Sequence, residues 1–362
     1  MKNNFDVLKI VSVLGRNYLF YFSRLFNYPL VAPDTLQLNI NFNCNLNCVM
    51  CHMDKKKKLV KKELGLEELK KVVFEGKEMG IKNVLILGGE PFLWKDSFKL
   101  IEFCNKEGMD TTVITNGTLL NKSLLGKIFS SRLPHLHLSL DGATSKTHNA
   151  IRGKNVFEKV MKNITLLSEY KKNTDSSFPT LGITFTIMKH NLREVPLMID
   201  LAKEMKVNSL NFQPVVVDNT EPRLRSVNSS VWIDKKDFSN LDSSIEKLVA
   251  LKKKSKENYD LIENTFSNLK LIKKYFKGQI KANSRPCYAG FNRLHVTQIG
   301  TGYLCDLSFG DIRKQSLKEI WFSQQAGEMR KKIKNCKTPC MQFCAYRPDF
   351  DAVENEIGKI FL

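Results

Sequence analysis

Short apolar runs alternate with longer amphipathic stretches over residues 36–215, and this alternation predicts the fold. The short runs have the length and composition of buried strands, and they occupy residues 36–42, 84–87, 112–115, 136–140, 182–187 and 209–214. Between them apolar residues recur at helical spacing, as in residues 66–79, 97–107, 155–170 and 192–205. Repeated strand–helix units predict an α/β fold with a parallel sheet inside and helices outside. Six units are too few for a closed eight-unit barrel, so the pattern predicts an open, partial (β/α)6 TIM-like barrel over residues 34–217.

Three further segments flank this barrel. Residues 1–33 form a predicted amphipathic helix, interrupted by Arg16, Asn17 and Arg24, which either caps a core or rests on a surface. It contains no transmembrane segment, because no apolar run is long enough, and no signal-peptide cleavage site. Residues 218–284 are rich in Ser, Asn and Lys and form a predicted helical linker, with helices over 240–251 and 259–276. Residues 285–362 form a cysteine-rich extension with a predicted hairpin (293–298 and 300–304) and a helix over 317–322.

Composition changes this picture mainly through the cysteines. The chain has 362 residues and 42% hydrophobic content, which is ample for a large core. Its 57 Lys and Arg and 37 Asp and Glu give a net charge of +20, but the excess is spread along the chain, as on solvated faces. Nine cysteines in a chain without a signal peptide indicate a cytoplasmic protein whose thiols stay reduced. Clustered cysteines then favour metal ligands over disulfides.

Three of these cysteines directly follow the first predicted strand. Cys44, Cys48 and Cys51 have the spacing C-x3-C-x2-C. A structural zinc site requires four ligands, so zinc is an alternative only if His52 or a distant residue completes the site. Three thiolates on a cubane iron–sulfur cluster leave one iron open to another ligand. The spacing therefore favours a cluster with an open iron.

Polar and glycine-rich motifs end the next three predicted strands. Gly88-Gly89-Glu90-Pro91 ends the second strand, and its glycines allow the backbone to approach a ligand closely. Asn116 ends the third strand, where it serves either a turn or a pocket wall. The fourth ends in Ser139-Leu140-Asp141-Gly142, followed by His148 and Arg152. We assign Asp141 a structural role, such as capping the next helix, and we interpret His148 as a surface or cap-region residue. Gln213, at the end of the sixth strand, is expected to face the same pocket.

These motifs, in order at successive strand ends, resemble the radical SAM superfamily. The resemblance implies that Cys44, Cys48 and Cys51 hold a [4Fe–4S] cluster whose open iron binds S-adenosylmethionine (SAM). It also implies reductive cleavage of SAM to a 5′-deoxyadenosyl radical, which abstracts a hydrogen from the substrate. No residue is singled out for catalysis beyond cofactor binding. The residues that the resemblance assigns to SAM binding are Gly88, Gly89, Glu90, Asn116, Ser139 and Arg152.

The cysteines of the C-terminal extension resemble those of the SPASM or twitch domains that bind auxiliary clusters. They are Cys287, Cys305, Cys336, Cys340 and Cys344. Five are too few for two clusters, so the resemblance implies one auxiliary [4Fe–4S] cluster. Cys287 and Cys305 are expected ligands, together with two of the last three, and a structural zinc is the alternative. Cys104 lies within a predicted helix and is expected to be a buried apolar residue.

The resemblance leaves the substrate open. We expect a peptide or protein side chain first, and a small molecule such as a sugar, oxidised by a dehydrogenase, second. The positive charge suits an acidic electron donor such as ferredoxin or flavodoxin. A zinc-dependent nucleic-acid-binding module is the rival class, but the tail lacks the clustered basic and aromatic residues of such modules, so no nucleic-acid partner is expected.

Overall fold

The computed structural model describes residues 2–51, 62–216, 229–280, 286–305, 307–336 and 341, with the backbone alone for residues 2–13. The strands are β1 Thr35–Asn39, β2 Asn83–Leu87, β3 Asp110–Thr115, β4 His135–Ser139, β5 Thr180–Ile187, β6 Ser209–Pro214, β7 Arg293–Val296, β8 Thr301–Leu304 and β9 Leu307–Asp311. The α-helices are α1 Lys2–Phe26, α3 Leu66–Glu78, α4 Ser97–Lys106, α5 Lys122–Ser130, α6 Ser145–Arg152, α7 Val156–Asn173, α8 Met198–Glu204, α9 Phe238–Lys254, α10 Lys256–Leu261, α11 Phe266–Phe276, α12 Leu317–Phe322 and α13 Gln324–Lys334. Short 3-10 helices are η1 Pro91–Leu93, η2 Lys189–Glu194 and η3 Lys235–Asp237.

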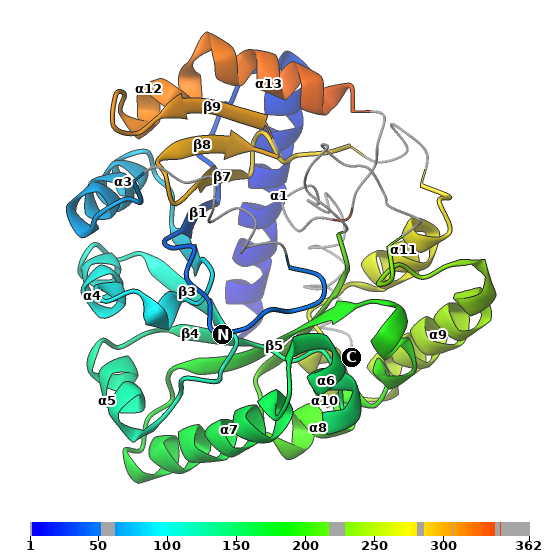
Figure 1. The fold of residues 1–362 in the computed structure, drawn as a ribbon. Coiled ribbons are helices and arrows are strands. Elements are labelled where there is room, and N and C mark those ends of the chain that lie inside the picture. Colours follow the sequence, from blue (N-terminus) through cyan, green and yellow to red (C-terminus); the bar gives the residue numbers. More distant parts are fainter. Residues whose placement is uncertain are drawn as a thin grey trace.

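The strands form one curved sheet in the order β6-β5-β4-β3-β2-β1-β7-β8-β9. Strands β1 to β6 are all parallel, and α3, α4, α5 and α7 lie on the outer side of the curve (Figure 1). This confirms the predicted α/β class and the open six-stranded partial barrel. The C-terminal extension continues the same sheet, because β7 pairs parallel with β1 and then leads into the antiparallel strands β8 and β9.

Alternation along the strands separates an apolar outer face from an inner face where polar side chains lie beside apolar ones such as Leu85 and Ile114. In β1, Leu36 and Leu38 are fully buried, while Gln37 between them is only partly covered. In β4, Leu136 and Leu138 are buried and His137 faces the other way. Side chains of a strand point alternately to its two faces, so the leucines pack beneath the helices and the polar residues line the lumen.

Two predicted elements have different bounds in the structure. The first strand ends at Asn39 rather than at residue 42, because the following residues leave the sheet for the cysteine loop. The helix predicted over 192–205 is instead η2 followed by α8. Pro196 lies between them, and a proline cannot supply the backbone N–H that a continuous helix needs there.

The helix predicted over 259–276 is also divided, into α10 and α11, and the residues between them cover the edge of the sheet. Ile262 bridges to Leu210 of β6, and Glu263 N donates to Leu210 O over 3.1 Å. The Asn264 side chain then accepts from Phe212 N (2.7 Å) and donates to Phe212 O (2.8 Å). An amide side chain thus replaces a missing neighbouring strand and satisfies backbone groups that an edge would leave open.

The two ends of the described chain pack against each other. Phe20 of α1 forms a small apolar cluster with Tyr288 and Phe291, which precede β7. The predicted hairpin is confirmed as β7 and β8, whereas β9 was not predicted. In the described residues we find no helix with the length and apolar character required to cross a membrane.

We expect Asn264→Ala to destabilise the fold by about 1–3 kcal/mol, because it leaves the N–H and C=O of Phe212 without their partners. Urea unfolding followed by circular dichroism measures the change. Asn173→Ala, at the exposed end of α7, is the matched control and should change the unfolding free energy very little. Equal stability of the two variants would show that Asn264 does not hold the sheet edge.

Candidate active site

The loop that carries Cys44, Cys48 and Cys51 is held against the end of β2. Gly89 N donates to Asn41 O (2.9 Å), and Glu90 N donates to Asn43 O (2.7 Å). A Cβ on Gly88 would overlap the Asn41 side chain, and a Cβ on Gly89 would overlap the Asn43 carbonyl. The two glycines are therefore required for this close approach of two backbones, which places the cysteine loop at the carboxyl edge of the sheet.

Glu90 connects the same strand end to the end of β3. Its side chain is fully buried and accepts hydrogen bonds from Thr115 Oγ1 (2.7 Å) and Asn116 N (2.8 Å). Burial raises the pKa of Glu90, although these hydrogen bonds act in the opposite direction. Asn116 in turn donates through Nδ2 to Asn45 Oδ1 (2.9 Å) and lies 4.0 Å from Cys44 Sγ. A polar chain thus runs from β2 through β3 to the first cysteine.

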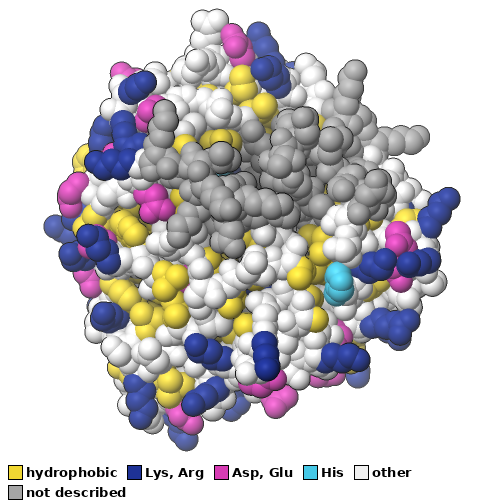
Figure 2. Space-filling view, viewed as in Figure 1, with side chains coloured by type: hydrophobic (Ala, Val, Ile, Leu, Met, Phe, Trp, Pro, Cys, Tyr) yellow, Lys and Arg dark blue, Asp and Glu magenta, His cyan; other side chains and the backbone are white. Residues whose placement is uncertain are grey.

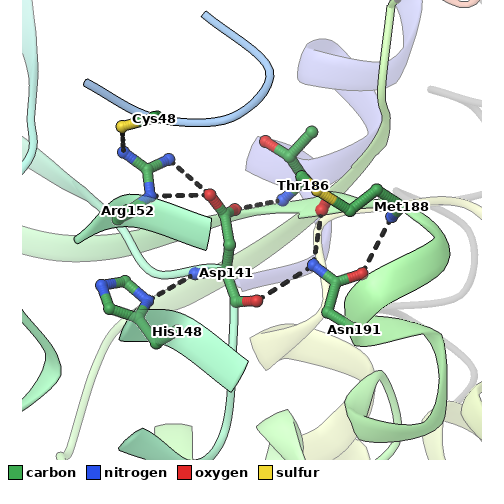
Figure 3. Close-up of polar contacts among 7 residues, drawn as sticks. All are labelled: Cys48, Asp141, His148, Arg152, Thr186, Met188 and Asn191. Carbon is green, nitrogen blue, oxygen red and sulfur yellow. Dashed lines mark hydrogen bonds and ion pairs between the residues drawn. The ribbon is translucent and has the colours of Figure 1, made fainter. Parts of the chain in front are cut away.

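Asp141 and Arg152 form a buried ion pair beside the second cysteine (Figure 3). Arg152 Nη2 lies 2.6 Å from Asp141 Oδ2, Nε donates to the same oxygen (2.7 Å), and Nη1 lies 3.8 Å from Cys48 Sγ. Burial, the largest single effect, lowers the pKa of Arg152, but the Asp141 carboxylate together with Cys48 and Cys51 outweighs it, and the pKa lies above its ordinary value. The guanidinium is therefore a fixed positive charge next to the cysteine loop.

Neighbouring elements hold Asp141 on every side (Figure 3). Its Oδ1 accepts from Thr186 N (2.7 Å), its carbonyl accepts from Asn191 Nδ2 (3.0 Å), and its N–H donates to His148 Nδ1 (3.0 Å). The cap prediction for Asp141 is wrong, because Thr144 caps α6. The surface prediction for His148 is also wrong, since its side chain is fully buried. Burial lowers the pKa of His148 to about 3, so the ring is neutral and accepts the Asp141 hydrogen bond.

Burial also affects the thiols. It raises the pKa of Cys48 to about 11, against the opposing effect of Arg152, and it raises the pKa of Cys44. Such thiols lose their protons when a metal binds them, because a coordinating thiol is deprotonated outright. Cys104, as predicted, is a buried apolar residue in α4, and burial raises the pKa of its thiol to about 12.

The donor set of this loop fits an iron–sulfur cluster. Three thiols lie on one loop, and Cys51 N donates to Cys48 O (2.9 Å) in a turn that keeps the last two together. Within the part of the chain that the structure describes, no three Cys, His, Asp or Glu side chains converge closely enough to hold one metal ion. In a cubane the three thiolates bind three separate irons. His52, the proposed fourth zinc ligand, lies outside the described residues.

Ser139 and Gln213 lie on the inner face of the barrel. Ser139 ends β4 on the same face as His137, two residues earlier. Gln213 of β6 lines the pocket inside the barrel, as predicted. The pocket has a volume of about 540 Å³. Its polar and charged lining residues include Gln37, Thr112, His137, Thr184, Asn211, Gln213, Glu263, Arg293, His295 and Tyr303.

Most of these lining residues carried no signal in the sequence, because they belong to no motif and come from distant segments. Glu263 accepts from Asn211 Nδ2 (2.9 Å), and Arg293 Nη1 donates to Gln37 Oε1 (2.9 Å). His137 lies over Gly182, where any Cβ would come within 2.6 Å of the ring. Burial lowers the pKa of His137, while Glu263 acts in the opposite direction. In the sequence, the one signal that could have identified them was the polar positions that alternate with apolar ones along the strands.

Among the auxiliary cysteines that the structure describes, Cys305 reaches this pocket. Cys305 lines the pocket directly after β8, in the left-handed region with φ 57°. The loop of Cys287 is held by two arginines. Arg24 Nε donates to Cys287 O (3.2 Å), and the buried Arg330 donates to Gly290 O (2.9 Å) while lying 4.4 Å from the ring centre of Trp321. Burial lowers the pKa of Arg330 to about 9.

The remaining predicted ligands lie near the end of the chain. Cys336 follows α13, where its N–H donates to Ile333 O (3.1 Å). Cys340 and Cys344 lie outside the described residues. The choice among these three cysteines therefore stays a prediction.

Known proteins resemble this chain in both the barrel and the C-terminal extension. Residues 38–202 match the model of the radical SAM superfamily, and residues 287–345 match that of the SPASM iron–sulfur cluster-binding domain. The AdoMet-dependent heme synthase of Methanosarcina barkeri is 26% identical, over 87% of this chain and 89% of its own. The PqqA peptide cyclase of Rhizobium meliloti is 23% identical, over 82% of this chain and 76% of its own.

The fold is shared with a solved structure. The crystal structure of Streptococcus suis SuiB bound to its precursor peptide SuiA superposes with a TM-score of 0.64 at 15% identity, covering 94% of this chain and 79% of SuiB. The two family matches show a radical SAM domain over residues 38–202, which carries the cysteine loop at the carboxyl edge of the partial barrel, and a C-terminal SPASM domain over residues 287–345.

Proposed function

We propose that this enzyme binds its SAM-cleaving [4Fe–4S] cluster through Cys44, Cys48 and Cys51 and acts on a peptide or protein side chain held in the barrel pocket. The radical SAM and SPASM matches imply [4Fe–4S] clusters and SAM as the cofactors of this enzyme. The ligands, the SAM contacts and the substrate are our proposal. The observation that carries it is the contact of Arg152 and Asn116 with two cysteines of one loop, at the carboxyl edge of a barrel whose interior holds a pocket.

The proposed SAM contacts come from three neighbouring strand ends. Gly88 and Gly89 bring the backbone close, and Asn116 and Arg152 already reach the cysteine loop. Glu90 contributes through its backbone and by holding Asn116, because its carboxylate is occupied by Thr115 and Asn116. The remaining proposed contact, Ser139, faces inward at the end of β4.

When bound, the cluster and SAM supply the 5′-deoxyadenosyl radical, and the protein positions the reacting groups and excludes competing reactions. Arg152 has five N–H donors, of which three point at Asp141 and Cys48. The remaining donors suit the SAM carboxylate, which an arginine fork binds well. Because the ion pair with Asp141 fixes the orientation of the guanidinium, the Arg152 side chain does not need to reorganise when SAM binds.

The auxiliary cluster is proposed to bind through Cys287, Cys305 and two of Cys336, Cys340 and Cys344. Cys305 supports this assignment, since a non-glycine residue with φ 57° next to a pocket is a strained position of the kind found at functional sites. An auxiliary cluster there would face the substrate across the pocket and could accept an electron from the substrate radical.

The pocket itself favours a side chain of a peptide over a large polyanion. Its volume of about 540 Å³ lies in the range of small-ligand sites. Among the described lining residues Arg293 is the single Lys or Arg, and it is accompanied by Glu263. The relative that acts as a heme synthase makes a tetrapyrrole the second candidate, but tetrapyrroles carry several carboxylates and would need more cationic partners. A sugar stays a further alternative, since the lining can donate and accept hydrogen bonds.

We also propose a cytoplasmic location and an acidic electron donor such as ferredoxin or flavodoxin. The net charge of +20 supports electrostatic attraction of an acidic partner. On the face shown in Figure 2, Lys and Arg are scattered around the rim and do not form one patch. This distribution supports a diffuse attraction of an acidic partner.

We expect protein purified without oxygen to contain about eight irons per chain, and Cys48→Ala and Cys305→Ala each to contain about four. Only Cys48→Ala should abolish 5′-deoxyadenosine formation with SAM and reductant, because the open iron belongs to the Cys48 cluster. Iron, sulfide and zinc assays and chromatography of the nucleoside measure this. Cys104→Ala, in the core of α4, is the control and should keep both clusters. Stoichiometric zinc without the nucleoside would contradict the proposal.

Arg152→Lys should weaken SAM binding by about tenfold or more, because lysine keeps the charge but loses the fork that gives charge-assisted hydrogen bonds. Asp141→Asn should unfold the protein more easily, by about 3–5 kcal/mol, since it leaves the Arg152 charge buried without its partner. Equilibrium dialysis with SAM and urea unfolding measure the two effects. Lys146→Met, at an exposed position of α6, is the control. Wild-type SAM affinity in Arg152→Lys would remove Arg152 from the SAM site.

Deuterium transfer tests the substrate class. Extracts from cells grown in heavy water are separated into a peptide and protein fraction and a small-molecule fraction, and each is incubated with the enzyme, SAM and reductant. We expect deuterated 5′-deoxyadenosine from the peptide and protein fraction, because hydrogen abstraction carries the label to the nucleoside. Label from the small-molecule fraction alone would contradict a peptide substrate.

Two histidines of β4 provide a matched pair for the same assay. His137 lines the pocket, whereas His135 binds Thr180 and Asp110 at the opposite end of the strand. His137→Asn should lower the deuterated fraction of the nucleoside by about tenfold, the effect of about 1.4 kcal/mol. His135→Asn should leave that fraction unchanged. Equal fractions for both variants would place the substrate elsewhere.

A further inference from the structure

The second half of α1 has its polar and apolar sides reversed relative to a surface helix of a soluble protein. Its polar side chains face the protein: Asn17 and Ser23 are buried, Arg16 pairs with Asp34, and Arg24 binds Cys287 O. A surface helix normally directs its charged and polar residues to water. The sequence interruptions by Arg16, Asn17 and Arg24 are therefore contacts with the protein body, and they leave the other side of the helix apolar.

The outward side of this helix and the residues after it form a continuous apolar surface, which we call the aromatic face. Its members are 41–64% exposed. Phe22 stacks on Phe26 with ring centres 6.0 Å apart, and Tyr28 contacts Phe322 of α12 at 5.9 Å. The aromatic face comprises Tyr18, Leu19, Tyr21, Phe22, Leu25, Phe26, Tyr28, Leu30 and Phe322. Contiguous exposed apolar surface of this kind marks an interaction site, whereas single exposed residues do not.

Lysines of α13 border the aromatic face. Lys334 Nζ donates to Leu25 O (3.0 Å), and Asn27 Nδ2 donates to Gly327 O (3.0 Å), so α13 lies against the end of α1 (Figure 1). Lys331 lies one turn before Lys334, on the side of α13 that also carries Gly327, and Lys332 is exposed next to it on the adjoining side of the helix. We call Lys331, Lys332 and Lys334 the basic rim. Residues 14–30 contain no Asp or Glu. The rim and the face together present apolar and positive surface side by side.

We propose that the aromatic face seats the enzyme on an anionic membrane surface, with α1 in the plane of the interface and the basic rim on the lipid headgroups. Tyrosine and phenylalanine rings suit the boundary between acyl chains and headgroups, and a helix that buries an apolar side there needs no membrane-spanning length. Each lysine near an anionic leaflet adds about 1 kcal/mol of attraction. The charge of the basic rim therefore favours an anionic membrane as the partner, because an apolar face bordered by positive side chains complements negatively charged lipid.

A second copy of this chain fits the aromatic face less well. A two-fold dimer places the same patch of both subunits together, so each basic rim would approach its counterpart's face. Each chain also carries a net charge of +20, and like charges of this size oppose self-association. The proposed membrane binding does not depend on the proposed substrate or on either cluster.

The test uses the full chain with its clusters and two kinds of vesicle, phosphatidylcholine alone and phosphatidylcholine mixed with phosphatidylglycerol. We expect the protein to sediment with the mixed vesicles at least about tenfold more tightly, and to be released in part by salt, because the headgroup contacts are screened. Equal or absent sedimentation with both kinds of vesicle would overturn the proposal.

Paired variants separate the two contributions. Phe22→Glu/Phe26→Glu should reduce binding to mixed vesicles by about tenfold or more, while Phe74→Glu, an equally exposed phenylalanine on α3, should not. Lys331→Glu/Lys332→Glu should remove the preference for phosphatidylglycerol. Lys159→Glu/Lys162→Glu, on α7, makes the same change in net charge and should keep the preference. Melting temperatures show that each variant folds.

Sedimentation velocity without lipid completes the test. We expect a monomer at all concentrations. A dimer that Phe22→Glu/Phe26→Glu dissociates, combined with no vesicle binding, would overturn the membrane proposal and assign the aromatic face to self-association. Wild-type vesicle binding by Phe22→Glu/Phe26→Glu would overturn it as well. Deoxyadenosine formation in solution is unaffected by either result, so this test is independent of the proposed function.

Discussion

A buried carboxylate, Asp141, holds together the elements that form the active site. Its oxygens and backbone bind α6 through Arg152, β5 through Thr186 and η2 through Asn191. An unpaired charge at this depth would cost several kcal/mol, so the fold must bring Arg152 to it and keep it there. Because Arg152 also reaches Cys48 Sγ, the position of the cysteine loop depends on the same pair. The ion pair that the fold needs in order to bury Asp141 thus also positions the cysteine loop of the proposed active site.

The rest of the site follows from the parallel sheet. Parallel strands gather their carboxyl ends at one edge, and the loops that bear Cys44, Glu90 and Asn116 therefore meet there. Alternation sends leucines outward and residues such as His137 inward, so one strand supplies both core and pocket. This close packing of the loop also requires glycine at positions 88 and 89, since a larger residue would push the cysteine loop away.

The sequence was informative wherever the determining signal is local. Apolar periodicity identified all six barrel strands, and the spacing of Cys44, Cys48 and Cys51 pointed to the loop that we propose as the cluster site. Partners that are distant in sequence were not predictable in this way. Asp141 was assigned to a cap because nothing nearby in the sequence reveals its pairing with Arg152, and Asn264 imitates a strand for Phe212, 52 residues away. The pocket charges Glu263 and Arg293 likewise meet only after the sheet has closed around them.

Helix α1 contacts the loop of Cys287 with one side and carries the exposed aromatic face on the other. Arg24 holds the carbonyl of Cys287 on the inner side of the helix, while the neighbouring Leu25 belongs to the exposed aromatic face. The buried Arg330 holds Gly290 from the opposite side, on the same helix as the basic rim. Two helices that border the proposed lipid contact therefore also position the loop of an auxiliary cysteine.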